Sequence, residues 1–264
     1  MTASLLSTPH GARLECLVTG AGEPVTVFAH GLGCTVAETR PLGSGVGGTR
    51  VFFAFRGHGR SSTPPSGFGY AELARDLRAV ADAHGATRAV ATSMGAGALC
   101  RLLADTPDRF ERLVFFLPAV LDGARAPRPE LAALAEAVET GDRDALAAAL
   151  RREIPAHLAR TATAEAFVRE RVEGMLAGGG IVAALHGVAG QPPLPGGADV
   201  LAAVTAPALV LACEGDPVHP AAVGARLATL LPAAELHTYS EPGVLWRERA
   251  DLRRRISGFL GGQT

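Results

Sequence analysis

The chain has 264 residues, of which 48% are hydrophobic and 19% are charged, so it can bury a sizeable core within one domain. Its 25 basic residues are all arginines and balance 26 acidic residues, and the net charge of -1 excludes the basic surface that nucleic-acid binding requires. The absence of lysine also excludes Schiff-base chemistry on a lysine and a phosphate-binding loop that ends in Gly-Lys.

The first part of the chain alternates short apolar runs with helical patterns, which predicts a mostly parallel sheet covered by helices. Helices are predicted over Tyr70–His84, where Leu73, Leu77 and Val80 have helical spacing, and over Gly95–Ala104. The strands predicted in this part are, in chain order, Ser4–Ser7, Leu14–Val18, Val25–Ala29, Arg50–Phe55, Arg88–Thr92 and Leu113–Leu117.

The alternation stops between Leu121 and Pro207, where the patterns are helical and no strand is predicted. The segment 190–197 contains three prolines and is expected to lead the chain back to the sheet through Asp199–Val204. We therefore predict a core domain of residues 1–120 and 205–264, with residues 121–204 forming an inserted helical cap. The helices expected in the cap are Pro129–Glu139, Asp142–Glu153 and Thr163–Leu176.

After this insertion the strand pattern resumes. Ala208–Cys213 and Glu235–Tyr239 are predicted strands, and Arg247–Leu260 is predicted to close the chain as a core helix. The whole pattern predicts the α/β fold class, with eight strands in a mostly parallel sheet that is flanked by helices.

The strongest local signal for chemistry surrounds Ser93. The sequence Arg-Ala-Val-Ala-Thr-Ser-Met-Gly-Ala-Gly over Arg88–Gly97 runs from a short apolar strand through a Gly-rich turn into a helix. Such a turn holds its serine exposed in a strained conformation, and the small residues Ala91 and Gly95 allow backbone segments to approach closely. Ser93 is therefore a candidate nucleophile, and the alternative is a serine that caps the following helix.

Three further segments accompany this turn. His30-Gly31-Leu32-Gly33 ends an early strand, Arg-Gly-His-Gly-Arg-Ser occupies residues 56–61, and Gly215-Asp216-Pro217 follows a late strand. In their order and spacing, these segments and the Ser93 turn resemble the α/β-hydrolase superfamily over nearly the whole chain. The resemblance implies an α/β-hydrolase fold in which the helical insertion is a cap over the active site.

The resemblance also implies roles for single residues. Ser93 would be the nucleophile, Asp216 the acid of a triad, and the backbone amides of Leu32 and Met94 the oxyanion hole, because two fixed donors stabilise charge that develops on a carbonyl oxygen. A capping aspartate is the alternative for Asp216. Substrate-binding residues are expected beside the oxyanion segment, at His30, Gly31 and Cys34.

The end of the chain departs from the family pattern. Family members carry a histidine in the loop after the last strand, and a gapless alignment places Val244 at that position. A serine without a general base is a poor nucleophile at neutral pH. His219, three residues after Asp216, is the candidate replacement, and a packed loop histidine is its alternative. His237 is expected to be structural, and two cap histidines are placed where they could face a pocket, His157 and His186.

These features predict an enzyme that attacks an ester, thioester or related acyl carbon through Ser93, by hydrolysis or acyl transfer, with an incomplete or rearranged triad. The expected substrate is an apolar small molecule, free or carrier-bound. Two alternatives remain open: a non-covalent lyase, isomerase or cyclase, and a catalytically inactive small-molecule-binding protein that uses the same capped pocket.

The remaining features bear on compartment and cofactors. The four cysteines have no C-x-x-C spacing, so neither a zinc cluster nor a disulfide framework is predicted, and no cofactor is expected. No apolar stretch approaches the roughly 20 residues of a membrane helix, and the first residues lack a signal-peptide pattern. We expect a reduced, cytoplasmic protein without membrane or nucleic-acid partners, and make no prediction of its oligomeric state.

Overall fold

The structure is a computed structural model that describes residues 3–64, 68–123, 129–177 and 180–262. In this part of the chain eight strands form one sheet, in the order β1-β2-β4-β3-β5-β6-β7-β8. β2 runs antiparallel to both of its neighbours, and all other pairs are parallel, so the predicted sheet is confirmed. The strands are β1 (Ser4–Ser7), β2 (Arg13–Thr19), β3 (Val25–Ala29), β4 (Thr49–Phe53), β5 (Arg88–Thr92), β6 (Arg112–Phe116), β7 (Ala208–Cys213) and β8 (Ala234–Tyr239).

The centre of the sheet is apolar because both of its faces are covered. Every residue of β3 and β7 is buried, and continuous apolar runs such as theirs are typical of strands covered on both sides. β1 and β8 form the edges, where Leu5 and Leu236 are exposed. The strand bounds expected from the sequence agree with the structure to within two residues.

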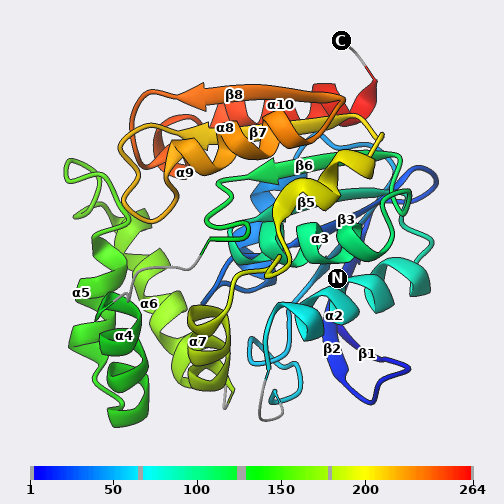
Figure 1. Ribbon diagram of the computed structural model, residues 1–264. Coiled ribbons are helices and arrows are strands. Elements are labelled where there is room, and N and C mark those ends of the chain that lie inside the picture. Colours follow the sequence, from blue (N-terminus) through cyan, green and yellow to red (C-terminus); the bar gives the residue numbers. More distant parts are fainter. Residues whose placement is uncertain (1–2, 65–67, 124–128, 178–179, 263–264) are drawn as a thin grey trace.

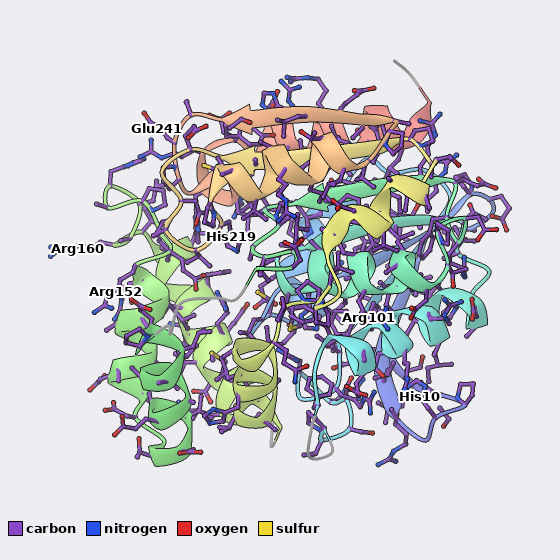
Figure 2. The ribbon with its side chains drawn as sticks, viewed as in Figure 1. His10, Arg101, Arg152, Arg160, His219 and Glu241 are labelled. Carbon is purple, nitrogen blue, oxygen red and sulfur yellow. The ribbon has the colours of Figure 1, made fainter. Side chains whose placement is uncertain are left out.

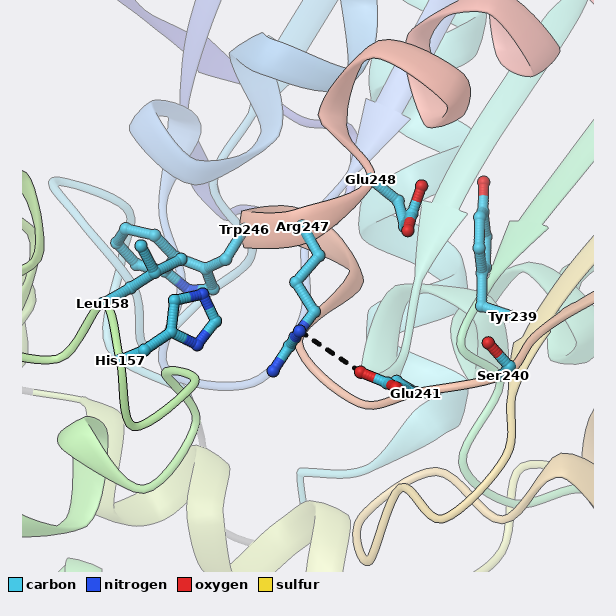
Figure 3. A pocket seen from close by; sticks show the side chains of 8 residues that line it. All are labelled: His157, Leu158, Tyr239, Ser240, Glu241, Trp246, Arg247 and Glu248. Carbon is cyan, nitrogen blue, oxygen red and sulfur yellow. Dashed lines mark ion pairs between the residues drawn. The ribbon is translucent and has the colours of Figure 1, made fainter.

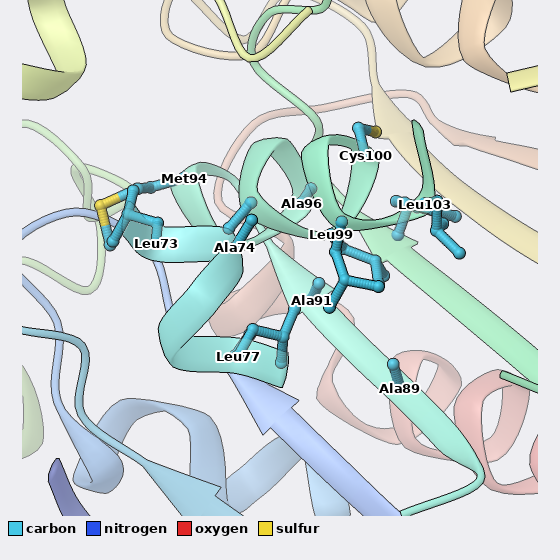
Figure 4. Packing of buried hydrophobic residues seen from close by; sticks show 14 of the residues in the cluster. Leu73, Ala74, Leu77, Ala89, Ala91, Met94, Ala96, Leu99, Cys100 and Leu103 are labelled. Atoms are coloured by element: carbon cyan, nitrogen blue, oxygen red, sulfur yellow. The ribbon is translucent and has the colours of Figure 1, made fainter. Parts of the chain in front are cut away.

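Helices pack on both faces (Figure 1). On one face, α2 (Tyr70–Ala83), α3 (Met94–Asp105) and α8 (Ala221–Leu230) share a large apolar cluster with the strands, and Figure 4 shows part of it. Alternate strand residues point to the other face, so Val27 belongs to this cluster and Phe28 to a second one. That second cluster includes residues of α1 (Val36–Thr39), η1 (Arg40–Gly43), α9 (Val244–Arg247) and α10 (Arg249–Gly261).

The helix predicted at the end of the chain is confirmed as α10, which begins at Arg249, two residues later than predicted, and ends at Gly261. The short helix α9 that precedes it is absent from the sequence-based prediction, and Glu248, with φ of -114°, separates α9 from α10. α8 is also a helix that the sequence-based prediction lacks. Its alanine-rich sequence has little of the apolar and polar alternation from which an amphipathic helix is recognised.

Four helices lie between β6 and β7, within the predicted cap, whose residues 124–128 and 178–179 lie outside the described residues. They are grouped on the side to which the arrowheads of β6 and β8 point (Figure 1), which is the carboxyl edge of the parallel strands. η2 (Ala198–Ala203) then leads back to β7. The helices are α4 (Pro129–Thr140), α5 (Arg143–Arg151), α6 (Ala162–Ala177) and α7 (Ile181–Gly190), of which α7 is absent from the sequence-based prediction.

This insertion has an apolar cluster of its own. Leu32 of the core is packed against it, so the insertion rests on the segment that follows β3. In the described residues no single helix is long and apolar enough to cross a membrane, and α6 and α7 reach that length only as a pair bent by 94°. The insertion cluster consists of Ala135, Ala137, Leu146, Leu150, Ile154, Ala164, Val168, Val172, Met175, Ile181 and Leu185.

Candidate active site

Ser93 occupies a strained turn between β5 and α3. Its φ of 50° and ψ of -108° lie where residues other than glycine are rare. The turn needs a small residue at Gly95, because a β-carbon there would lie 2.7 Å from the carbonyl oxygen of Ala29. The Ser93 side chain makes no capping bond to α3, so the helix-cap alternative does not hold. The hydroxyl is free to bond elsewhere.

The Ser93 hydroxyl meets an imidazole from the loop after β7. His219 Nε2 lies 2.9 Å from Ser93 Oγ, and His219 Nδ1 lies 3.2 Å from both carboxylate oxygens of Asp216. The structure thus brings together the three side chains that the sequence analysis proposed for catalysis. Figure 2 shows His219 beside the helices of the insertion, at the carboxyl edge of the sheet.

Asp216 holds this loop as well as the imidazole. Its Oδ1 accepts hydrogen bonds from the amides of Val218 at 2.8 Å and His219 at 2.9 Å. Burial by itself raises the pKa of Asp216, but the hydrogen bond and charge of His219 and the two amides outweigh burial and lower the pKa. The helix that follows has Pro220 as its N-cap, so the helix-cap alternative for Asp216 does not hold either.

The ionised carboxylate determines what the imidazole can do. When Asp216 accepts the Nδ1 proton of His219, Nε2 is left with its lone pair facing the Ser93 hydroxyl. A proton can then pass from Ser93 Oγ to His219 Nε2 while Asp216 stabilises the resulting imidazolium. The arrangement can therefore activate a serine nucleophile.

The two amides proposed for the oxyanion hole lie on segments that meet beside Ser93. A β-carbon added at Gly31 would lie 3.4 Å from Ser93 Cβ, and the amide of Gly95 donates to the carbonyl of His30 at 3.1 Å. Within the described residues, the amides of Leu32 and Met94 donate to no protein acceptor. Both donors are therefore available to a ligand.

The segment that carries the Leu32 amide is a tight turn of residues 31–34, named the oxyanion turn after the role expected of that amide. The amide of Cys34 donates to the carbonyl of Gly31 at 3.1 Å, and Gly33 has φ of 70°, a conformation that favours glycine at the third position of a type II turn. The Gly31 carbonyl and the Leu32 N–H belong to one peptide group and point in opposite directions. A group that fixes the Gly31 carbonyl therefore also fixes the direction of the Leu32 N–H.

His30 is the residue that fixes the Gly31 carbonyl. Its Nδ1 donates to the Gly31 carbonyl at 2.7 Å, because its Nε2 accepts from the amide of Phe55 at 2.9 Å. Burial lowers the pKa of His30 to about 4, against the opposing hydrogen bond to Gly31, so the ring is neutral. The prediction that His30 binds substrate is corrected: its side chain is fully buried and both nitrogens are bound by the backbone.

His58 binds the same turn through the amide of Gly33. Its Nε2 accepts from the amide of Gly33 at 3.1 Å, and its Nδ1 donates to the carbonyl of Arg56. Burial and the neighbouring His30 lower the pKa of His58 to about 3. Through His58 the Arg-Gly-His-Gly-Arg-Ser segment of residues 56–61 is joined to the turn that carries the Leu32 amide.

Cys34 closes the turn next to the site. Burial raises the pKa of its thiol to about 12, so the sulfur is a neutral group. Its Sγ would lie 3.9 Å from a β-carbon placed on Gly31, which puts the thiol near the nucleophile without a hydrogen bond to it. Gly31 itself offers substrate only backbone atoms.

The other histidines lie away from Ser93. His186 is exposed, and His157 lines a cavity of about 570 Å³ between the insertion and the segment after β8, which Figure 3 shows. The ion pair between Glu241 and Arg247 crosses this cavity at 3.2 Å. Ser93 does not line this cavity, so an apolar pocket above Ser93 stays a prediction. Two residues near the chain end are structural: His237, whose ring contacts that of Tyr239, and Val244, buried in the second cluster.

Comparisons with known proteins agree with this geometry. Residues 24–243 match the model of the alpha/beta hydrolase fold family. A hydrolase from Pseudomonas aeruginosa PA01 shares 26% identity and a TM-score of 0.77, with 98% of each chain covered. An enol-lactonase from Burkholderia xenovorans LB400 shares 21% identity and a TM-score of 0.81, covering 98% of this chain and 100% of that one. An esterase from Exiguobacterium antarcticum shares 17% identity and the same TM-score and coverage. No curated protein matches the chain.

Proposed function

The chain belongs to the alpha/beta hydrolase fold family, and on this premise we propose that it is a serine-dependent acyl hydrolase whose general base is His219. The observation that carries the proposal is the 2.9 Å contact between His219 Nε2 and Ser93 Oγ, with Asp216 bonded to the opposite nitrogen. A base must lie within hydrogen-bond reach of the proton it removes, and His219 meets that condition.

The reaction follows from this arrangement. Ser93 Oγ attacks the acyl carbon while His219 Nε2 takes the hydroxyl proton, and the amides of Leu32 and Met94 hold the negative oxygen of the tetrahedral intermediate. His219 then gives its proton to the departing alkoxide or thiolate. An acyl-enzyme remains on Ser93, and a water deprotonated by His219 hydrolyses it to the free acid.

In this proposal the acid and the base share one loop. Asp216 and His219 are three residues apart, and Asp216 Oδ1 also holds the amides of Val218 and His219. The loop therefore carries a compact acid and base pair, which replaces the histidine expected at Val244. This geometry favours covalent catalysis over the non-covalent enzyme and the inactive binding protein, because neither alternative needs an imidazole on the serine hydroxyl.

The proposed substrate is an apolar small-molecule ester or thioester, and the helical insertion acts as a cap that selects it. Met175 of α6 would lie 3.5 Å from a β-carbon on Gly33, and Leu32 contacts the insertion cluster, so apolar side chains lie beside the oxyanion turn. The names of two similar structures, an esterase and an enol-lactonase, support carboxylic esters as the substrate class. Acyl transfer in place of hydrolysis would require that the cap exclude water.

The test uses p-nitrophenyl esters of short fatty acids and a fluorophosphonate probe. Ser93→Ala should abolish labelling, and His219→Ala should lower kcat by at least about 100-fold, because general-base catalysis contributes about two to four orders of magnitude. The double variant should be no slower than the slower single variant, because the two residues act as a unit. His237→Ala is the control and should keep full activity. Retention of turnover by Ser93→Ala would overturn the proposal.

A further inference from the structure

A buried arginine of the insertion reaches the oxyanion turn. Arg171 projects from α6, only 5% of its surface is exposed, and its guanidinium NH2 donates to the carbonyl of Gly33 at 3.3 Å. The NH1 group donates to Glu153 at 2.6 Å, and the ring of Phe167, one helical turn earlier, lies 5.7 Å from the guanidinium. Two elements that are 138 residues apart in the chain thus meet at one carbonyl.

The Gly33 carbonyl is linked to the oxyanion donor by a chain of peptide groups. It shares a peptide with the Cys34 N–H, which donates to the Gly31 carbonyl, and that carbonyl shares a peptide with the Leu32 N–H. In each peptide the C=O and N–H dipoles point the same way along this chain, so each hydrogen bond polarises the next. The positive guanidinium stands at one end, and the free N–H of Leu32 stands at the other.

The burial of Arg171 is costly for a residue with only a structural role. Its Nε is buried without a hydrogen-bond partner, and its carboxylate partner Glu153 is about half exposed. Replacing a buried ion pair by apolar side chains of similar volume is often neutral or stabilising. The neighbouring residues Val168, Val172 and Met175 already pack α6 into the insertion cluster, which Leu32 of the core contacts.

We infer that Arg171 is a positioning residue of the reaction, which holds the Gly33 carbonyl and thereby aims and polarises the Leu32 amide toward the oxyanion. This inference deepens the proposed function and rests on it. It makes α6 of the insertion a part of the catalytic machinery. Arg171 binds the oxyanion turn from the insertion, and His30 and His58 bind it from the core.

The kinetic test compares four variants on a p-nitrophenyl ester. Arg171→Met should lower kcat about 10- to 100-fold with KM changed less than about threefold, because a misaligned donor loses part of the 100- to 1,000-fold that one oxyanion donor contributes. Arg171→Lys keeps the charge and should recover part of kcat. Arg169→Met, on an exposed residue of the same helix, should match the wild type. Glu153→Gln should cost less than Arg171→Met.

A trifluoromethyl ketone with the same acyl chain separates positioning from stability. It forms a tetrahedral adduct with Ser93 whose oxyanion needs both amides, so its Ki should rise in Arg171→Met by the factor that kcat falls. An unchanged kcat, a rise in KM alone, or an equal loss in Glu153→Gln would overturn the inference. If Arg171→Met does not fold, Arg171→Gln and Arg171→Lys carry the same comparison.

Hydrogen exchange keeps the test independent of the proposed function. Peptides that cover residues 31–35 should exchange faster in Arg171→Met than in the wild type or in Arg169→Met, and equal protection would overturn the inference even in an inactive protein. A wild type without Ser93-dependent hydrolysis would instead overturn the proposed function.

Discussion

Burial and hydrogen-bond partners give His30, His58 and His219 different roles. His30 and His58 are buried beneath the oxyanion turn, and each has one nitrogen that accepts a backbone N–H, so each ring must be neutral to keep its hydrogen bonds. His219 is partly exposed, and its nitrogens face a carboxylate and a hydroxyl. The first two rings are therefore suited to hold backbone groups, and the third is suited to transfer a proton.

Asp216→Asn should test how the acid acts. The amide side chain can still accept from Val218 and His219, but it no longer stabilises an imidazolium or selects the tautomer that leaves His219 Nε2 free. We expect kcat to fall at least about 100-fold with little change in melting temperature, since the same change in a serine protease costs about 10,000-fold.

The control for this variant is Asp199→Asn, which alters an exposed aspartate of η2. Steady-state kinetics and thermal unfolding of both variants provide the comparison. Wild-type kcat in Asp216→Asn would show that the carboxylate takes no part in the reaction.

At the scale of elements, the segment after β8 has become part of the core. Gly243, with φ of 86°, is the N-cap of α9, and a β-carbon there would lie 2.6 Å from Pro155 of the insertion. Val244 follows as the first residue of α9 and is 2% exposed among apolar side chains. Val244, at the position that aligns with the family histidine, is therefore a core residue. The imidazole beside Ser93 comes from His219 in the loop after β7.

Val244→His should consequently destabilise the protein without raising activity. An imidazole buried in the second cluster would lack a partner, which costs about 1–3 kcal/mol, and Asp216 is already bonded to His219. Urea unfolding and esterase assays measure both effects, with Val200→His at an exposed valine as the control. A gain in hydrolysis would show that α9 can approach Ser93.

At the scale of the whole molecule, the sheet brings four distant segments to its carboxyl edge. The segments after β3, β5 and β7 carry the turn of residues 31–34, Ser93 and the loop with Asp216 and His219, and the insertion after β6 contacts the first of them through Leu32. Ligands of open α/β sheets bind at this edge, so the architecture places the site before any side chain is considered.

The stability of the molecule should fall in mild acid because of the buried histidines. The pKa values of His30 and His58 are lowered from 6.5 to about 4 and about 3, so below pH 6.5 the unfolded chain binds protons that the folded protein does not. The free energy of unfolding should drop by up to about 1.4 kcal/mol per pH unit for each ring, until the pH reaches the folded pKa.

Urea unfolding between pH 7 and pH 4 measures this slope. His58→Gln should have a shallower slope than the wild type, whereas His186→Gln, which changes an exposed histidine, should keep the wild-type slope. Equal slopes in all three proteins would contradict the assignment of a neutral, buried His58.

Local patterns predicted much of the fold and part of the site. The turn at Ser93 depends on one strand, one serine and nearby small residues, all of which are adjacent in the chain. α7 escaped prediction because its sequence, Ile-Val-Ala-Ala-Leu-His-Gly-Val-Ala-Gly, is apolar on nearly every side and has no amphipathic period. The role of Arg171 had no sequence signal, because arginines are frequent on helices such as α6.

By itself, the sequence determined the strands, most of the helices, the family and the strained serine turn, because these depend on interactions within one strand, turn and helix. Only the tertiary structure decided which histidine reaches Ser93 and which cation reaches the oxyanion turn. Those contacts join residues 126 and 138 positions apart. They depend on how the sheet aligns its strand ends and where α6 packs. No local pattern of residues encodes a contact between segments that lie so far apart in the chain.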